Sequence, residues 1–221
     1  MNMKKQAVLA AMLAGIGVSM ILPQGNREIL AAEAEIKTIQ EPVQVTVQEK
    51  EEAKEVVPTV PQNPCRTYEE GMAAYITSVN ETVTETEAMA MANCMLEQAE
   101  KRDIDANLLL AVAHTESTYY SDAVSCADYK GLMQTGDILA EEAGYSPESL
   151  FDPEVSIEVG AEYIEDQLEN FDDDLCLALT AYNQGPGAVY EGNYDTGYAE
   201  LTMKRVERIE NFLQKGGYTG E

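Results

Sequence analysis

The pattern of apolar residues beyond Cys65 is helical almost throughout, and it constrains the fold more than any other feature of the chain. Apolar side chains recur at spacings of three and four residues, and no stretch shows the alternation or turn signals of a strand or hairpin. We therefore expect residues 65–221 to form one all-α domain. The predicted helices run from Thr84 or Thr86 to about Lys101, from Asp105 to Glu116, from Asp137 to Gly144, from Pro153 to Phe171, from Leu175 to Tyr182 and from about Ala199 to Leu213.

The helix predicted from Asp105 to Glu116 is apolar nearly all round. Asp105 is a favourable N-cap, and the run Leu108-Leu109-Leu110 is followed closely by Val112. A helix that lacks a polar face is buried on all sides. We expect this helix to be the central one of the domain.

The first 64 residues differ in composition from the rest. Residues 1–34 resemble an export signal, with two lysines before an apolar run at 7–22 and a small-x-small pattern at Ala32-Glu33-Ala34. Two interpretations stay open, a cleaved signal peptide and a retained membrane anchor. Both export the remainder of the chain, either secreted or anchored at the cell surface. Residues 35–64, rich in Glu, Val and Pro, are expected to form an extended linker.

The acidity of the chain belongs to the predicted domain. The formal net charge is −26, and residues 1–64 carry 8 acids and 6 bases, which leaves 32 acids and 8 bases in residues 65–221. A surface this negative repels nucleic acid and anionic lipid headgroups. We therefore expect no nucleic-acid partner.

Cysteine and histidine usage limits the kinds of site that the chain can build. The four cysteines are Cys65, Cys94, Cys126 and Cys176, none of them in a C-x-x-C pair, and His114 is the single histidine. This pattern predicts no zinc site, and we expect neither metal nor cofactor. In an exported protein the cysteines are expected to form two disulfides, with the pairing open and free buried thiols as the alternative.

Glu116 is the candidate catalytic residue. It ends the most hydrophobic helix, where burial and the negative end of the helix dipole both disfavour the ionised carboxylate. The acidic surroundings act in the same direction, so we expect a raised pKa, as a general acid requires. The alternative is a charged helix-end residue that faces water. His114, about 200° away around the helix, is expected to point elsewhere and to be an ordinary buried or surface histidine.

Two further segments have a composition suited to a sugar-binding surface. Gly131-Leu132-Met133-Gln134 joins a loop to a helix, and Ala181-Tyr182-Asn183 is followed by Gly185-Pro186-Gly187. Tyrosine rings stack on pyranose faces, and amides bond hydroxyl and N-acetyl groups. Each segment alone is a weak signal, because Gly and Pro after a helix often only end it.

Taken in order, these motifs resemble the catalytic domain of the soluble lytic transglycosylase family, which is related to goose-type lysozyme. The resemblance runs from about Leu108 to Gly192 and is carried by Glu116-Ser117, by Gly131 to Gln134, by Phe151-Asp152-Pro153 and by Ala181-Tyr182-Asn183. It implies a lysozyme-like helical fold for residues 65–221. It also implies that the substrate is the glycan strand of peptidoglycan.

The resemblance further implies a reaction and the roles of individual residues. Family members break the β-1,4 bond after N-acetylmuramic acid without water and leave a 1,6-anhydro end. Glu116 would act as acid and then as base, and Ser117 would orient it. The other expected substrate-binding residues are Gly131, Met133, Gln134, Tyr182, Asn183 and, on a looser match to the last helix, Tyr198.

Two other functions stay open at this point. A water-using muramidase on the same fold needs a second carboxylate, which Asp122 or Asp128 could supply. A domain without activity that binds the wall or serves as an assembly scaffold is the other alternative. The biological process is also open, and local wall opening for machinery of the cell envelope is one of the options.

Overall fold

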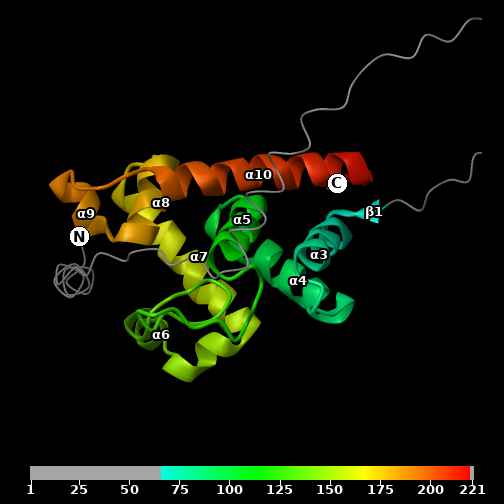
Figure 1. Cartoon of the computed structure of the whole chain (residues 1–221), viewed down its shortest axis with the longest axis horizontal. Helices are drawn as coiled ribbons and strands as arrows, with labels where there is room; N and C mark the ends of the chain where they lie inside the picture. The colour runs from blue at the N-terminus through cyan, green and yellow to red at the C-terminus, as the bar shows by residue number, and fades with distance from the viewer. Residues whose placement is uncertain (1–65, 220–221) are drawn as a thin grey trace, which may run out of the picture. The chain divides into compact units, whose positions relative to one another are not determined.

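The computed structural model describes residues 66–219, which form a helical domain (Figure 1). Its elements in chain order are β1 (Arg66–Thr67), α3 (Tyr68–Val79), α4 (Glu85–Arg102), α5 (Ala106–Glu116), α6 (Asp137–Glu142), the 3₁₀ helix η1 (Pro147–Phe151), α7 (Pro153–Asn170), α8 (Leu175–Gln184), α9 (Pro186–Glu191), α10 (Gly197–Gly216) and β2 (Tyr218–Thr219). The strands β1 and β2 pair in parallel over two residues each. The all-α prediction is confirmed, with this short pair as the only sheet among the described residues.

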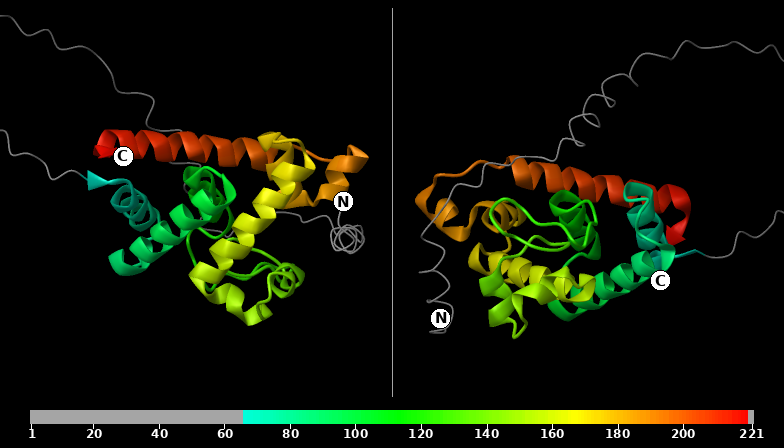
Figure 2. Two further views of the ribbon diagram at one scale, coloured as in Figure 1. Left: turned by 180° about the vertical axis from the view of Figure 1, so that it is seen from behind. Right: turned by 60° about the horizontal axis from the view of Figure 1, so that its bottom comes forward.

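The helix α5 lies at the centre of the domain, as its all-round apolar sequence predicts. Every residue from Ala106 to His114 is buried. The helix packs against α10 and α4, and α10 runs along one side of the domain above it (Figures 1 and 2). Asp105 caps α5 by accepting a hydrogen bond from the Asn107 backbone N–H at 2.8 Å.

The first two described helices begin with the same local device. The side chains of Thr67 and Thr84 each accept a hydrogen bond from the backbone N–H three residues later. The residue at that position is a glutamate, whose carboxylate accepts a bond from the backbone N–H of the threonine. This reciprocal capping box satisfies backbone donors at the start of α3 and α4. The helix α4 then packs against both α3 and α7. The helices α3, η1 and α9 are not among those that the apolar periodicity predicts.

The segment between α5 and α6 is irregular. Two isolated antiparallel bridges, Val124 to Lys130 and Lys130 to Thr135, fold it back on itself. The Lys130 ammonium forms an ion pair with Asp137 at the start of α6. This folded-back segment connects Glu116 to the turn that contains Gly131.

The cysteines do not pair as predicted. Cys94, Cys126 and Cys176 are free thiols, and Cys65 lies outside the described residues. Two disulfides among four cysteines would need a bond between two of these three, so that prediction is wrong. Cys94 lies on α4, Cys126 in the loop between α5 and α6, and Cys176 on α8.

The predicted export segment at residues 1–34 and the predicted linker at 35–64 lie outside the described residues. Within residues 66–219, no helix combines the length and the apolar character that crossing a bilayer requires.

Candidate active site

Glu116 is the last residue of α5, and its carboxyl group faces α10. The Tyr198 hydroxyl, in the first turn of α10, donates a hydrogen bond of 2.6 Å to Glu116 Oε1. Both residues are held by the packing of α5 against α10. The hydroxyls of Thr115 and Thr202, 3.4 Å apart, also meet between these two helices. The carboxyl group is therefore partly buried and has a fixed orientation.

Burial raises the pKa of Glu116 from 4.5 to about 7. The hydrogen bond from Tyr198 and the positive charge of Arg205 both act in the opposite direction, because they stabilise the carboxylate. The direction predicted from the sequence is confirmed, and burial is its main cause as expected. The acidic residues that the structure describes do not add to this rise in the pKa of Glu116. The charged group that acts on Glu116 is the cation of Arg205.

Ser117 follows Glu116 and is buried, but its hydroxyl points back along the helix. It donates a hydrogen bond of 3.1 Å to the Ala113 carbonyl oxygen. The next two residues, Thr118 and Tyr119, have φ of 53° and 63°, so the chain reverses direction immediately after α5. Ser117 therefore acts on the end of the helix, and the structure shows no direct bond through which it would orient the Glu116 carboxyl.

The turn from Gly131 to Gln134 is held by backbone geometry that requires glycine. Gly131 has φ of 75°, and a Cβ placed on it would lie 1.8 Å from the Leu150 carbonyl oxygen. The Gln134 side-chain amide donates bonds to the carbonyl oxygens of Ala123, at 3.0 Å, and Gly131, at 2.9 Å. These two bonds close the loop that begins after Glu116.

The side chain of Met133 lies in the core behind this turn. Its side chain is fully buried and packs against Gly160 of α7. Its backbone is fixed from two sides, because the N–H donates to Ser156 Oγ at 3.0 Å and the carbonyl accepts from the Tyr182 hydroxyl at 2.7 Å. Met133 therefore contributes its backbone to the turn, while its side chain packs into the core.

Tyr182 connects the turn at Met133 with Tyr198, the residue that donates to Glu116. Besides its bond to Met133, its ring is stacked on Tyr198 with centroids 6.5 Å apart and lies 5.2 Å from the ring of Tyr163. The negative charge of Glu116 contributes to raising the pKa of Tyr182, after burial. Asn183, the next residue, is half-buried near the end of α8. The structure thus brings Glu116, Tyr198, Tyr182 and the backbone of Met133 into one cluster.

His114 belongs to the core behind Glu116, as predicted. Its Nδ1 lies 3.0 Å from the Tyr75 hydroxyl, and burial lowers its pKa to about 3, which keeps the ring neutral. Arg205 of α10 adds to this shift and has a buried Nη1 with no hydrogen-bond partner among the described residues. Arg205 is not among the site residues predicted from the sequence. The available signal was its spacing of seven residues from Tyr198, which places both on one face of a helix.

The two acids considered as water-positioning groups lie at the surface. Asp122 and Asp128 are both exposed, and Asp128 pairs with Lys130 at 3.4 Å. Neither contributes to the pKa shift of Glu116. The described site therefore contains a single buried carboxyl group.

Residues 93–200, which include every residue of this cluster, match the family model of the transglycosylase SLT domain. This chain carries a transglycosylase SLT domain. The resemblance found in the motifs is thereby confirmed.

Proteins similar to this SLT domain include two membrane-bound lytic murein transglycosylases. Form F of Maricaulis maris is 37% identical over 99 residues, which cover 42% of this chain and 21% of the relative. Form C of Edwardsiella ictaluri is 32% identical over 107 residues, which cover 41% of this chain and 30% of the relative. The chain therefore spans less than a third of the length of these curated relatives.

The fold of the SLT domain is also similar to that of a solved structure. The 70 kDa soluble lytic transglycosylase of Escherichia coli superposes with a TM-score of 0.51 at 20% sequence identity, covering 68% of this chain and 31% of that one. This likeness supports the lysozyme-like helical fold expected from the sequence.

Proposed function

We propose that this protein is a peptidoglycan lytic transglycosylase, which cleaves the β-1,4 bond between N-acetylmuramic acid and N-acetylglucosamine. The observation that carries the proposal is the Glu116 carboxyl group, partly buried at the end of α5, bonded to Tyr198 and with a pKa of about 7. A carboxyl group with this pKa is substantially protonated near neutral pH, so it can donate a proton in catalysis. The SLT domain and its relatives' names supply the substrate class.

In the proposed reaction Glu116 acts twice. It first gives its proton to the glycosidic oxygen as the bond to the anomeric carbon breaks. The resulting carboxylate then takes the proton from the 6-hydroxyl of the same muramoyl sugar, whose oxygen bonds to the anomeric carbon and closes the 1,6-anhydro ring. Tyr198 and Arg205 support this cycle, because both stabilise the ionised form that exists between the two proton transfers.

The remaining predicted residues are proposed to hold the glycan. Gln134 and Asn183 offer half-buried amides, and Tyr182 keeps the turn and Tyr198 in register through its hydroxyl and ring. Gly131, Ser117 and Met133 act through the backbone, by shaping the turn and the end of α5. None of these roles requires a metal or a cofactor.

The proposed setting is outside the cytoplasm, where peptidoglycan lies. The relatives are described as membrane-bound, and residues 1–34 of this chain have the sequence pattern of an export signal or anchor. We propose a secreted or surface-anchored enzyme with residues 35–64 as a spacer. An association with machinery of the cell envelope is compatible with such a spacer.

The decisive experiment compares wild type with Glu116→Gln on purified peptidoglycan. Loss of a positioned general acid is expected to lower the rate by about 10²- to 10⁴-fold. Glu97→Gln, which removes an exposed carboxylate from α4, is the matched control and is expected to retain wild-type activity.

Mass spectrometry of the products separates the alternatives. New 1,6-anhydro ends support the transglycosylase, whereas reducing ends would mean a muramidase that uses water. If wild type and Glu116→Gln bind the glycan equally and neither releases fragments, the domain is a wall-binding module and the proposal is wrong.

A further inference from the structure

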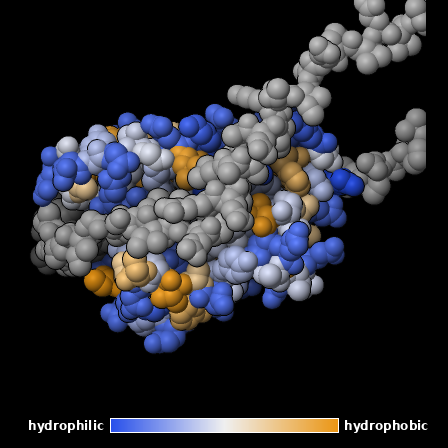
Figure 3. All heavy atoms as spheres, viewed as in Figure 1, coloured by the Kyte–Doolittle hydropathy of each residue, from blue (hydrophilic) through white to orange (hydrophobic). Residues whose placement is uncertain are grey.

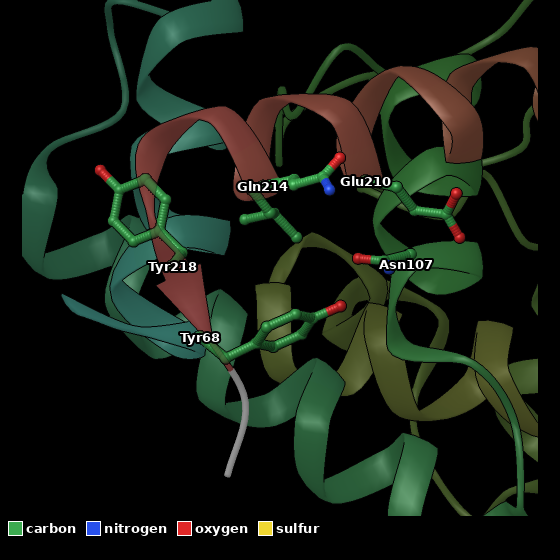
Figure 4. A pocket seen from close by; sticks show the side chains of 6 residues that line it. Tyr68, Asn107, Glu210, Gln214 and Tyr218 are labelled. Carbon is green, nitrogen blue, oxygen red and sulfur yellow. The ribbon is translucent and has the colours of Figure 1, made fainter. Parts of the chain in front are cut away.

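A hollow lies at the opposite end of α5 from Glu116. It is a cavity of about 270 Å³ between the start of α5, the end of α10 and β2 (Figure 4). Its lining residues are Tyr68, Asn107, Glu210, Leu213, Gln214 and Tyr218. With a rise of 1.5 Å per residue, Asn107 and Glu116 are about 14 Å apart along α5. The cavity is therefore separate from the proposed active site.

Asn107 presents an unpaired acceptor to this cavity. The residue is only 6% exposed, and its Oδ1 has no hydrogen-bond partner among the described residues. Its side chain bonds to Tyr68, and its oxygen points into the hollow in Figure 4. Leaving a buried acceptor unpaired costs about 1–3 kcal/mol. A ligand with an N–H or O–H donor would remove this cost.

The charges around the cavity favour a positively charged donor. Glu210 is one of the lining residues, and its carboxylate and that of Asp105 both add to the effect of burial in raising the pKa of Tyr68. The cavity also lies at the C-terminal end of α10, a helix of 20 residues whose carbonyl dipoles favour cations. The N-terminus of α5, which would favour an anion, is already capped by Asp105.

A cation is already bound at the edge of this region. The Arg66 guanidinium lies over the Tyr218 ring, 5.3 Å from its centroid, and its Nη1 donates to the Gly216 carbonyl oxygen at 3.4 Å. Aromatic faces and C-terminal carbonyls attract cations in this way. Arg66 thus shows the kind of group that these surroundings stabilise.

We propose that the cavity is a binding site for a primary alkylammonium group, such as the end of a lysine-like side chain in a peptide. The ammonium would donate to Asn107 Oδ1 and pair with Glu210, while the methylene groups pack against Leu213 and the two tyrosine rings. The volume is below the range of about 300–1,000 Å³ that holds drug-sized ligands, so the occupant is a side chain and not a large cofactor. This inference goes beyond the proposed function, because binding here is independent of Glu116.

The test is an NMR titration of the full chain with n-pentylammonium chloride. Saturable shifts are expected at the Asn107 side-chain amide and at the methyl groups of Leu213. Pentanoate, which has the same chain length and the opposite charge, and 1-pentanol, which is neutral, are the matched probes. Both are expected to bind more weakly than pentylammonium.

The variant Glu210→Gln is expected to weaken pentylammonium binding by about threefold to fivefold, the effect of losing one partly exposed ion pair. Glu207→Gln makes the same charge change three residues earlier on α10, outside the lining of the cavity, and is expected to bind like wild type. Both side chains are exposed, so both variants are expected to fold. The proposal is overturned if pentylammonium causes no saturable shift, if 1-pentanol or pentanoate binds as tightly, or if both variants lose affinity equally.

Discussion

At the scale of single residues, the pair formed by Glu116 and Tyr198 sets the chemistry of the site. Tyr198 donates to the carboxylate and thereby lowers the pKa of Glu116 below the value that burial alone would give. In Tyr198→Phe we expect the pKa of Glu116 to rise above about 7, so the loss of activity with increasing pH should begin at higher pH.

The same substitution should lower the maximal rate by about 10- to 100-fold, because a hydrogen bond to a charged group contributes about 1.5–3 kcal/mol. Profiles of rate against pH on purified peptidoglycan measure both effects. Tyr190→Phe, which changes an exposed tyrosine on α9, is the control and should leave the profile unchanged. A profile displaced to lower pH in Tyr198→Phe would contradict the assigned direction of this hydrogen bond.

The raised pKa of Glu116 also predicts how stability depends on pH. The folded-state pKa is about 7 against 4.5 for an unperturbed carboxyl group, so the folded protein keeps a proton that the unfolded chain releases. The corresponding stability is fully present below pH 4.5 and is lost as the pH rises to about 7. This difference in pKa corresponds to about 3 kcal/mol, which is reduced by the solvent that reaches this partly buried group.

Glu116→Gln lacks this titration. Its free energy of unfolding relative to wild type should therefore increase between pH 4 and pH 8 and stay constant above that. Denaturant titrations of both proteins across this range measure the difference, in which the other acids cancel. Parallel stability curves would show that Glu116 has an ordinary pKa.

The sequence predicted part of this residue-level arrangement. The end of an entirely apolar helix was enough to predict a raised pKa at Glu116. Tyr198 came only from a loose resemblance, and Arg205 was missed, because a contact between α5 and α10 depends on how two helices separated by 80 residues pack. The spacing of seven residues places Arg205 on the same helix face as Tyr198, but it does not say which other helix packs against that face.

At the scale of elements, a glycine explains why α3 was not predicted from the sequence. Gly71 is in the interior of α3, where glycine usually disfavours a helix. A Cβ at this position would lie 2.5 Å from Leu213 and 2.6 Å from Tyr218, so glycine is needed for α3 to approach the end of the chain. The capping box of Thr67 and Glu70 was visible in the sequence, but the reason for Gly71 exists only in the folded domain.

Gly160 gives a testable case of the same effect. It lies in α7 against the turn of the site, and a Cβ there would lie 2.6 Å from Cβ and 2.7 Å from Cγ of Met133. Gly160→Ala is expected to destabilise the protein by about 1–3 kcal/mol, because overpacking outweighs the better helix propensity of alanine. It should also displace the Met133 backbone that accepts from Tyr182 and so reduce activity.

Thermal unfolding with a lytic assay on the same samples measures both consequences. Gly197→Ala is the control, since a Cβ there meets only the flexible Asp195 side chain at the exposed start of α10. An unchanged or higher Tm for Gly160→Ala would contradict this prediction, because it would mean that Met133 can move aside for the added methyl group at no cost.

At the scale of the whole molecule, the sequence separated the acidic helical domain from residues 1–64 but could not pair the cysteines. Export permits disulfides, and only the positions of the thiols decide whether they form. Cys94 is one of the free thiols. Its Sγ donates a hydrogen bond to the Glu154 carbonyl oxygen at 3.7 Å, and burial together with nearby acids raises its pKa to about 12. Such a thiol is almost entirely protonated and reacts slowly.

The charge of the domain predicts a dependence of stability on salt. Residues 65–221 hold 32 acids and 8 bases, and the described surface in Figure 3 is largely hydrophilic with scattered hydrophobic residues. Ion pairs, such as those of Arg102 with Glu162 and Glu165, offset only part of this repulsion. Because salt screens like charges, raising NaCl from 20 to 200 mM at pH 7.5 should increase Tm by a few degrees, on the order of 1 kcal/mol.

Repeating the series at pH 4 provides the internal control for this effect. Many of the Asp and Glu side chains are then protonated, so the repulsion is smaller and the increase in Tm with salt should shrink. The two series together separate charge repulsion from a general effect of salt on hydrophobic burial, which would persist at both pH values. A Tm that falls with salt at pH 7.5 would show instead that the ion pairs of Arg102 and Lys130 outweigh the net negative charge.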